Sequence, residues 1–159
     1  MSMYEVGDIV EDFELQSTNG TYRLSDRVKD NYALLYFYVV NFGKTCTDYM
    51  AIMNERLPDL QRRKVELVHI NPDTVENHRD WMRSTASLYE HLSDAGQKVS
   101  RDFDCIITDS PNDKIIGMTN RAFFLIDRDL RIRYCWRADV PHDTVPFDEL
   151  LSRIDEALS

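Results

Sequence analysis

Two apolar runs separated by a helical stretch constrain the fold of this chain most strongly. Residues 33–40 read ALLYFYVV, and residues 65–70 read VELVHI. The first run lacks polar alternation, which is typical of a central strand covered on both faces. Apolar residues recur at helical spacing over 47–63, where Pro58 predicts a kink or break. A strand, a helix and a second strand in this order require a parallel β-α-β unit.

The rest of the pattern adds two hairpins and more helices. Asn19-Gly20 lies between short alternating runs and predicts an N-terminal β-hairpin. Residues 122–126 and 131–137 flank a polar turn and predict a second, antiparallel hairpin. In the last strand, one face is expected to carry Ile132, Tyr134 and Trp136, and the other Arg131, Arg133, Cys135 and Arg137. Further elements are expected as helices over 74–84 and 97–103 and from Pro146 to the end, and as a short strand near 91–92.

This order predicts one α/β domain over 1–159, with a mixed central sheet and helices on both faces. The net charge of −9 argues against a nucleic-acid surface. The sequence has no apolar stretch of about 18 residues, so we expect no membrane span. Residues 1–5 lack a secretory signal pattern, and three widely spaced cysteines form no disulfide framework. We therefore expect a cytoplasmic protein.

The sequence predicts neither a metal site nor a bound cofactor. His69, His78, His91 and His142 have no metal-ligand spacing, and we interpret all four as structural or solvated. Glycine is scarce, and no loop is rich enough in it to hold a phosphate. Chemistry must then come from the side chains themselves.

Cys46 is the strongest candidate for such chemistry. It ends the turn at 41–46 that follows the 33–40 run, just before the helical pattern expected from Thr47. Free N–H groups and a positive partial charge at a helix start favour the thiolate, the reactive form of cysteine. A nearby guanidinium would add a larger effect, and Arg121, just before the apolar strand expected at 122–126, is the candidate. A thioredoxin-like sheet, as implied by the resemblance described below, would place that strand beside the 33–40 strand. Lys44, Thr45 and Thr47 are candidate supporting residues.

Several segments, taken in order, resemble the peroxiredoxins (AhpC/TSA-type thiol peroxidases), which have a thioredoxin-like fold. Residues 6–15 (VGDIVEDFEL) are similar to the family's opening segment, 92–94 (LSD) to its L-S-D, and 121–127 (RAFFLID) to its R-x-T-F-x-I-D. Asp73-Thr74 with His78 and Trp81 resembles a further family segment. In the active-site pattern P-x-x-x-T-x-x-C, Cys46 falls on the peroxide-attacking cysteine. The family's threonine and proline positions hold Gly43 and Val39.

The resemblance implies a thiol-dependent peroxidase that reduces hydrogen peroxide or organic hydroperoxides through a sulfenic acid at Cys46, with Arg121 as its partner. An external thiol or thioredoxin-like reductant would then regenerate the thiol, with Cys105 as the candidate internal resolving cysteine. The resemblance also implies a homodimer.

Gly43 and Val39 motivate an alternative, which is a redoxin-like binding or redox-sensing module without peroxidase chemistry. A thiol–disulfide exchange protein is a third interpretation, and the lack of a C-x-x-C pair argues against it.

Overall fold

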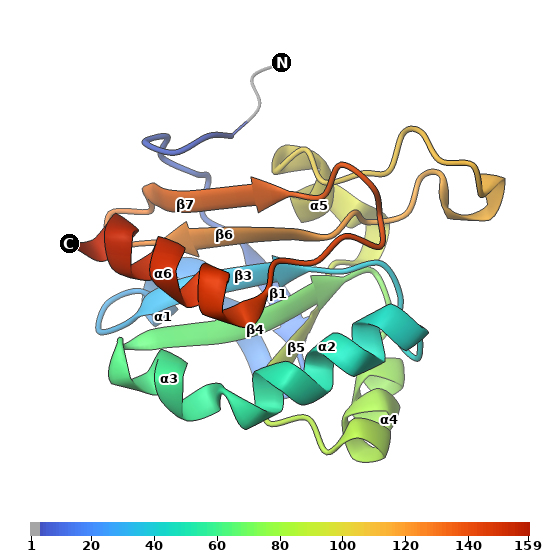
Figure 1. Ribbon diagram of the computed structural model, residues 1–159, viewed down its shortest axis with the longest axis horizontal. Helices are drawn as coiled ribbons and strands as arrows, with labels where there is room; N and C mark the ends of the chain where they lie inside the picture. Colours follow the sequence, from blue (N-terminus) through green and yellow to red (C-terminus); the bar gives the residue numbers. More distant parts are fainter. Residues whose placement is uncertain (1–3) are drawn as a thin grey trace.

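A seven-stranded mixed sheet forms the centre of the computed structural model, which describes residues 4–159. Residues 1–3, part of the segment used for the secretory-signal expectation, lie outside the described residues. The strands are β1 (Glu14–Ser17), β2 (Gly20–Arg23), β3 (Tyr32–Phe37), β4 (Val65–Asn71), β5 (Glu90–Ser93), β6 (Ala122–Ile126) and β7 (Ile132–Arg137). Their spatial order is β2-β1-β5-β4-β3-β6-β7, with β3 between β4 and β6 (Figure 1).

The strand pairing confirms both the parallel unit and the two hairpins. β3, β4 and β5 run parallel, whereas β6 is antiparallel to β3 and to β7. β1 and β2 form the N-terminal hairpin around Asn19, and β1 also pairs with β5. Every residue of β3 from Ala33 to Phe37 is buried, which agrees with its unbroken apolar pattern.

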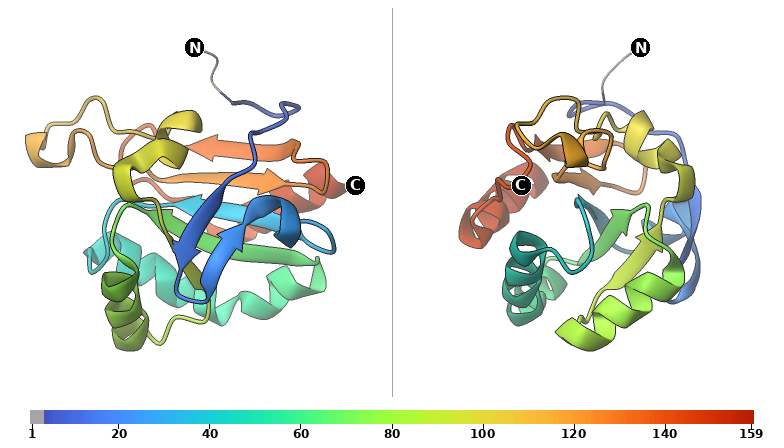
Figure 2. Two further views of the ribbon diagram at one scale, coloured as in Figure 1. Left: turned by 180° about the vertical axis from the view of Figure 1, so that it is seen from behind. Right: turned by 90° about the vertical axis from the view of Figure 1, so that its right-hand side faces the viewer.

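Helices cover both faces of the sheet. They are α1 (Leu24–Arg27), α2 (Lys44–Glu55), α3 (Leu57–Arg62), α4 (Val75–Thr85), α5 (Lys98–Asp102) and α6 (Phe147–Leu158), with 3-10 turns at Ala95–Gln97 and Asp113–Ile115. Side chains from α2, α3, α4 and α6 share one core with alternate residues of β3. The other core contains residues of α1 and α5 (Figure 2). Within residues 4–159, no helix has the length and apolar character needed to cross a membrane.

The predicted helix over 47–63 is two helices, and it begins earlier than expected. α2 ends at Glu55, and Pro58 lies in the first turn of α3, where its missing N–H is tolerated. α2 starts at Lys44 instead of Thr47, with Gly43 as its N-cap. Cys46 is therefore the third residue of the helix, and its position in the first turn is confirmed.

The expected faces of β7 are wrong in one respect. A β-bulge shifts the register, so that Leu125 pairs with Tyr134 while Ile126 pairs with Ile132. The extra residue turns Ile132 to the face opposite Tyr134 and Trp136, into the core that Cys135 also contacts. Strict alternation from the sequence cannot show such an insertion.

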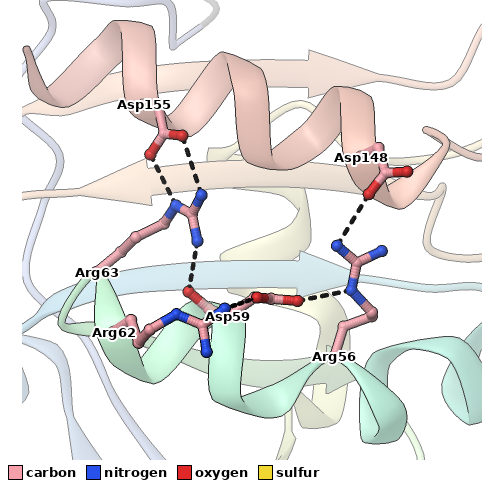
Figure 3. A network of polar contacts seen from close by, with 6 residues as sticks. All are labelled: Arg56, Asp59, Arg62, Arg63, Asp148 and Asp155. Carbon is pink, nitrogen blue, oxygen red and sulfur yellow. Dashed lines mark hydrogen bonds and ion pairs between the residues drawn. The ribbon is translucent and has the colours of Figure 1, made fainter.

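An arginine–carboxylate network holds α6 against α2 and α3 (Figure 3). Arg63 binds both carboxylate oxygens of Asp155, at 2.7 and 3.0 Å. Arg56, at the α2–α3 junction, reaches Asp148 at 2.8 Å and Asp59 at 2.6 Å. Paired arginine–carboxylate contacts of this kind fix geometry better than isolated surface pairs. The network therefore anchors the helix that follows the loop at 138–146, and this loop borders the site described next.

Candidate active site

Cys46 lies in the first turn of α2 and is 3% exposed. Its side chain belongs to the core under α2, together with Tyr36, Tyr49 and Phe123. A thiol in that position would be inert if apolar groups alone surrounded it. The decisive question is therefore which polar groups contact its sulfur.

Arg121 supplies that contact. Both terminal nitrogens of its guanidinium, Nη1 and Nη2, lie 3.5 Å from the Cys46 sulfur. The arginine is itself 2% exposed, and its Nη1 also donates to the Tyr36 hydroxyl. Burial by itself lowers the pKa of Arg121, but Tyr36 and Cys46 raise it above its ordinary value. The guanidinium is therefore a permanent buried cation, which favours a thiolate at this distance.

The sheet explains how residues 75 positions apart in the chain meet. Phe37 pairs with Ala122 across the antiparallel β3–β6 ladder. Arg121 precedes Ala122, and the chain turns into α2 shortly after β3 ends at Phe37. Cys46 and Arg121 therefore lie at the same end of two neighbouring strands, as the resemblance implied.

A cavity of about 420 Å³ opens in front of the sulfur. Four segments line it, at residues 39–40, 43–46, 110–112 and 140–142, together with Ile115 and Arg121. Most of its wall is apolar, with Val39, Ile115 and Val140 as its larger members. The segment around residue 110 extends away from the body of the protein in Figure 1. Although Cys46 has little exposed surface, it lines this cavity together with Arg121.

The supporting residues differ in what they do. Lys44 lines the cavity, but its amine pairs with Asp48 at 2.8 Å and is largely exposed. Thr45 lines the cavity too, and the Thr47 backbone N–H donates to the Gly43 carbonyl. Within the described part of the chain, neither threonine hydroxyl bonds to Cys46. The contribution of these three residues to catalysis stays a prediction.

The structure does not bring Cys105 to Cys46. Cys105 is fully buried in the opposite core, beyond the sheet, and burial raises the pKa of its thiol. Cys135 contacts the same core, and burial raises its pKa to about 11. Both thiols are therefore neutral and far less nucleophilic than a thiolate.

Three of the four histidines gather beside the loop that leads to Cys46. His69, His78 and His91 are all fully buried, and the rings of His69 and His91 stack with centroids 4.5 Å apart. Burial lowers the pKa of all three, that of His91 to about 3. His142, in contrast, is exposed and lines the cavity, which its isolated position in the sequence did not indicate.

This histidine cluster holds the loop through Asn41. The Asn41 amide nitrogen lies 3.0 Å from His78 Nδ1, and its oxygen accepts a 2.6 Å bond from the Tyr38 hydroxyl. Because an amide nitrogen only donates, His78 Nδ1 must accept, so its Nε2 donates to the Leu92 carbonyl at 3.0 Å. His78 is therefore neutral. Phe42 follows with a positive φ of 64°, a conformation that is uncommon for an aromatic residue.

Comparison with known proteins places these features in one family. The model of the AhpC/TSA family matches residues 6–135. The 1-Cys peroxiredoxin PER1 of Zea mays is 26% identical, over 97% of this chain and 73% of its own. The alignments with it and with four other plant 1-Cys peroxiredoxins cover 61% to 73% of those proteins' lengths.

Two solved structures show the same fold at low identity. A cysteine-to-serine mutant of peroxiredoxin 6 from Arenicola marina has a TM-score of 0.86 at 20% identity, covering 95% of this chain and 72% of its own. A yeast mitochondrial 1-Cys peroxiredoxin has a TM-score of 0.82 at 19% identity, covering 96% of this chain and 76% of its own. The family match spans the Cys46 turn, Arg121 and the strands that join them. The chain therefore belongs to the AhpC/TSA family, the peroxiredoxins.

Proposed function

We propose that this protein is a thiol-dependent peroxidase in which the Cys46 thiolate attacks the O–O bond of a hydroperoxide. The observation that carries this proposal is the fork of Arg121, with both terminal nitrogens 3.5 Å from the sulfur at the base of an open cavity. A redoxin-like module without chemistry would need neither the buried cation nor the access path. The alternative function is therefore not favoured.

The reaction balances with one proton and one hydroperoxide. The sulfur's electron pair forms an S–O bond with the terminal oxygen, the O–O bond breaks, and its electrons leave with the second oxygen. That oxygen takes up a proton and departs as an alcohol, or as water from hydrogen peroxide, and Cys46 becomes a sulfenic acid. Arg121 stabilises the thiolate first and the negative charge on the leaving oxygen later.

The cavity supports organic hydroperoxides as the preferred substrates. Hydrogen peroxide needs roughly twice the space of a water molecule, about 60 Å³. The cavity of about 420 Å³ is several times larger, and most of its wall is apolar. Each methylene group that it buries adds about 0.8 kcal/mol of binding, which is about fourfold in kcat/KM when the transition state keeps the contact.

An external thiol completes the cycle. It attacks the sulfenic acid, releases water and forms a mixed disulfide with Cys46, and a second thiol then frees Cys46 and leaves as a disulfide. The distance of Cys105 across the sheet and its neutral state support this one-cysteine route. The yeast 1-Cys peroxiredoxin is described as resolved through glutathione/thioredoxin systems, and we propose a reductant of this class here. A cytoplasmic location and a homodimer are further proposals, to be tested by fractionation and by light scattering.

The test is steady-state turnover with a thiol donor and a series of alkyl hydroperoxides of increasing size. We expect kcat/KM to rise from hydrogen peroxide to tert-butyl and cumene hydroperoxide. Cys46→Ser should abolish turnover, and Cys135→Ser is the matched control that should keep it. Absence of turnover by the wild-type protein with every peroxide would overturn the proposed activity. A higher kcat/KM for hydrogen peroxide would overturn only the substrate preference.

A further inference from the structure

Tyr36 is a polar residue in the middle of an apolar strand. It lies in β3 and is 1% exposed, with its ring 4.7 Å from that of Phe123 and 5.8 Å from that of Tyr38. Tyr36 pairs with Phe123, and Arg121 is its diagonal neighbour, two residues before Phe123 and immediately before β6 begins. In the core around it, the hydroxyl has one hydrogen-bond partner among the described residues, Nη1 of Arg121.

The ring of Tyr36 does not need this hydroxyl for packing. A phenylalanine would make the same stacked contacts with Phe123 and Tyr38 and would avoid burying a polar atom. Burial raises the pKa of Tyr36, so the hydroxyl stays neutral and presents a lone pair to the cation. What the oxygen adds at this position is therefore its bond to Arg121.

That bond fixes the plane of the guanidinium. Nη1 of Arg121 contacts two acceptors, the Tyr36 oxygen and the Cys46 sulfur, while Nη2 contacts the sulfur alone. Nε has no hydrogen-bond partner in the described residues. With Tyr36 in place, the fork is held at one corner by a neutral group that is not consumed in the reaction. Without that bond, only the sulfur would orient the fork, and the sulfur changes its charge and its bonding when it is oxidised.

We propose that Tyr36 is a positioning residue, which holds the Arg121 guanidinium in the orientation that directs both terminal nitrogens at Cys46. The role rests on the proposed peroxidase function for its effect on turnover. Its effect on the thiolate does not require turnover, because Arg121 stabilises the negative sulfur whether or not a peroxide follows. The effect of Tyr36 on the thiolate and its effect on turnover can therefore be tested separately.

Four variants test this role. Tyr36→Phe removes only the hydroxyl. Tyr49→Phe is the matched control, because Tyr49 is also buried, its ring lies 5.8 Å from that of Tyr36, and its hydroxyl donates to the Val145 carbonyl instead. Arg121→Lys keeps the charge but cannot form the fork. The double variant Tyr36→Phe with Arg121→Lys completes a double-mutant cycle, which measures whether the two side chains act together.

The readouts are the alkylation rate of Cys46 by iodoacetamide at neutral pH, which follows the thiolate population, and kcat and KM for tert-butyl hydroperoxide. A bond to a charged group predicts a fall in both the alkylation rate and kcat/KM of about tenfold in Tyr36→Phe. Tyr49→Phe should stay near wild type in both. In the Arg121→Lys background, Tyr36→Phe should cause almost no further loss, because the hydroxyl acts through the fork.

The results of these assays distinguish a positioning role for Tyr36 from a packing role, and each from failure of the proposed peroxidase function. Equal and additive losses from Tyr36→Phe in both backgrounds, or an equal loss in Tyr49→Phe, would overturn the role and leave Tyr36 as packing alone. Slower alkylation in Tyr36→Phe without any wild-type turnover would support the role and overturn the peroxidase instead. If Tyr36→Phe melts well below wild type, nitrogen NMR of the wild-type protein decides. Resolved, slowly rotating Nη groups of Arg121 support the role, and freely averaged ones contradict it.

Discussion

The effect of Gly43→Thr on stability should depend on residue 40: destabilising with valine there and slightly stabilising with alanine. The family's active-site threonine position holds Gly43, which is also the N-cap of α2 and makes no side-chain capping bond. A Cβ added there would lie 2.9 Å from the Cγ2 atom of Val40, closer than real Cβ contacts. Valine is stiff about χ1 and moves aside poorly, so overpacking of this kind costs about 1–3 kcal/mol.

Helix capping by a threonine at the same position has an opposite and smaller effect on the free energy of unfolding. Threonine at an N-cap is better than glycine by only a few tenths of a kcal/mol. The clash therefore decides the outcome in the natural background, and Gly43→Thr should lower the free energy of unfolding by about 1–3 kcal/mol. In a Val40→Ala background the obstacle is gone, and the same Gly43→Thr change should raise the free energy of unfolding by a few tenths of a kcal/mol.

The assay is urea unfolding of the four proteins in the cycle, followed by fluorescence of the two tryptophans and analysed at constant m-value. The matched control is Gly43→Ala, which adds the Cβ without the hydroxyl and should lose stability in the natural background with no capping gain in the other. If Gly43→Thr changes stability equally in both backgrounds, the contact with Val40 does not explain why this chain has glycine here.

Three further predictions follow from the same geometry. Burial lowers the pKa of His91 from 6.5 to about 3, so the unfolded chain binds more protons than the folded chain between these pH values. This one group should lower the free energy of unfolding by up to about 1.4 kcal/mol per pH unit below pH 6.5. Acid titration of unfolding should show a slope of this sign, and His91→Gln should reduce it by that amount. Cys105→Ser should leave turnover with an external thiol unchanged, and a loss of reductive turnover without loss of folding would restore Cys105 as the resolving thiol. Lys44→Ala should change kcat/KM by less than about twofold because its exposed pair with Asp48 is screened, and steady-state kinetics at two salt concentrations would reveal a larger role.

Sequence pattern predicted the strands well, because strands depend on periodicity, and the resemblance to a known family predicted that Arg121 lies beside Cys46. The range 122–126 agrees with β6, and the unbroken run ending near Val40 correctly indicated a central strand. Arg121 meets Cys46 because adjacent strands bring their ends together. Ile132 was placed on the wrong face because a bulge adds one residue that leaves no mark on local composition.

The rest of the site depends on contacts between distant segments, which no local pattern encodes. Tyr36 stands inside an apolar run and resembles a packing residue until the guanidinium is seen beside its hydroxyl. His78 and Asn41 are 37 positions apart and meet only after β4 and α4 fold. The cavity walls at 110–112 and 140–142 come from loops, whose paths the sequence did not predict.

The central claim is that the Cys46 sulfur, with the Arg121 guanidinium in contact with it at the cavity wall, reacts with a hydroperoxide. The most direct test adds one equivalent of tert-butyl hydroperoxide to the fully reduced protein and follows each cysteine by peptide mass spectrometry with a sulfenic-acid trap. We predict rapid trapping at Cys46, none at Cys105 or Cys135, and much slower trapping in Arg121→Lys. An unmodified Cys46, or trapping that is equally fast in Arg121→Lys, would contradict the account.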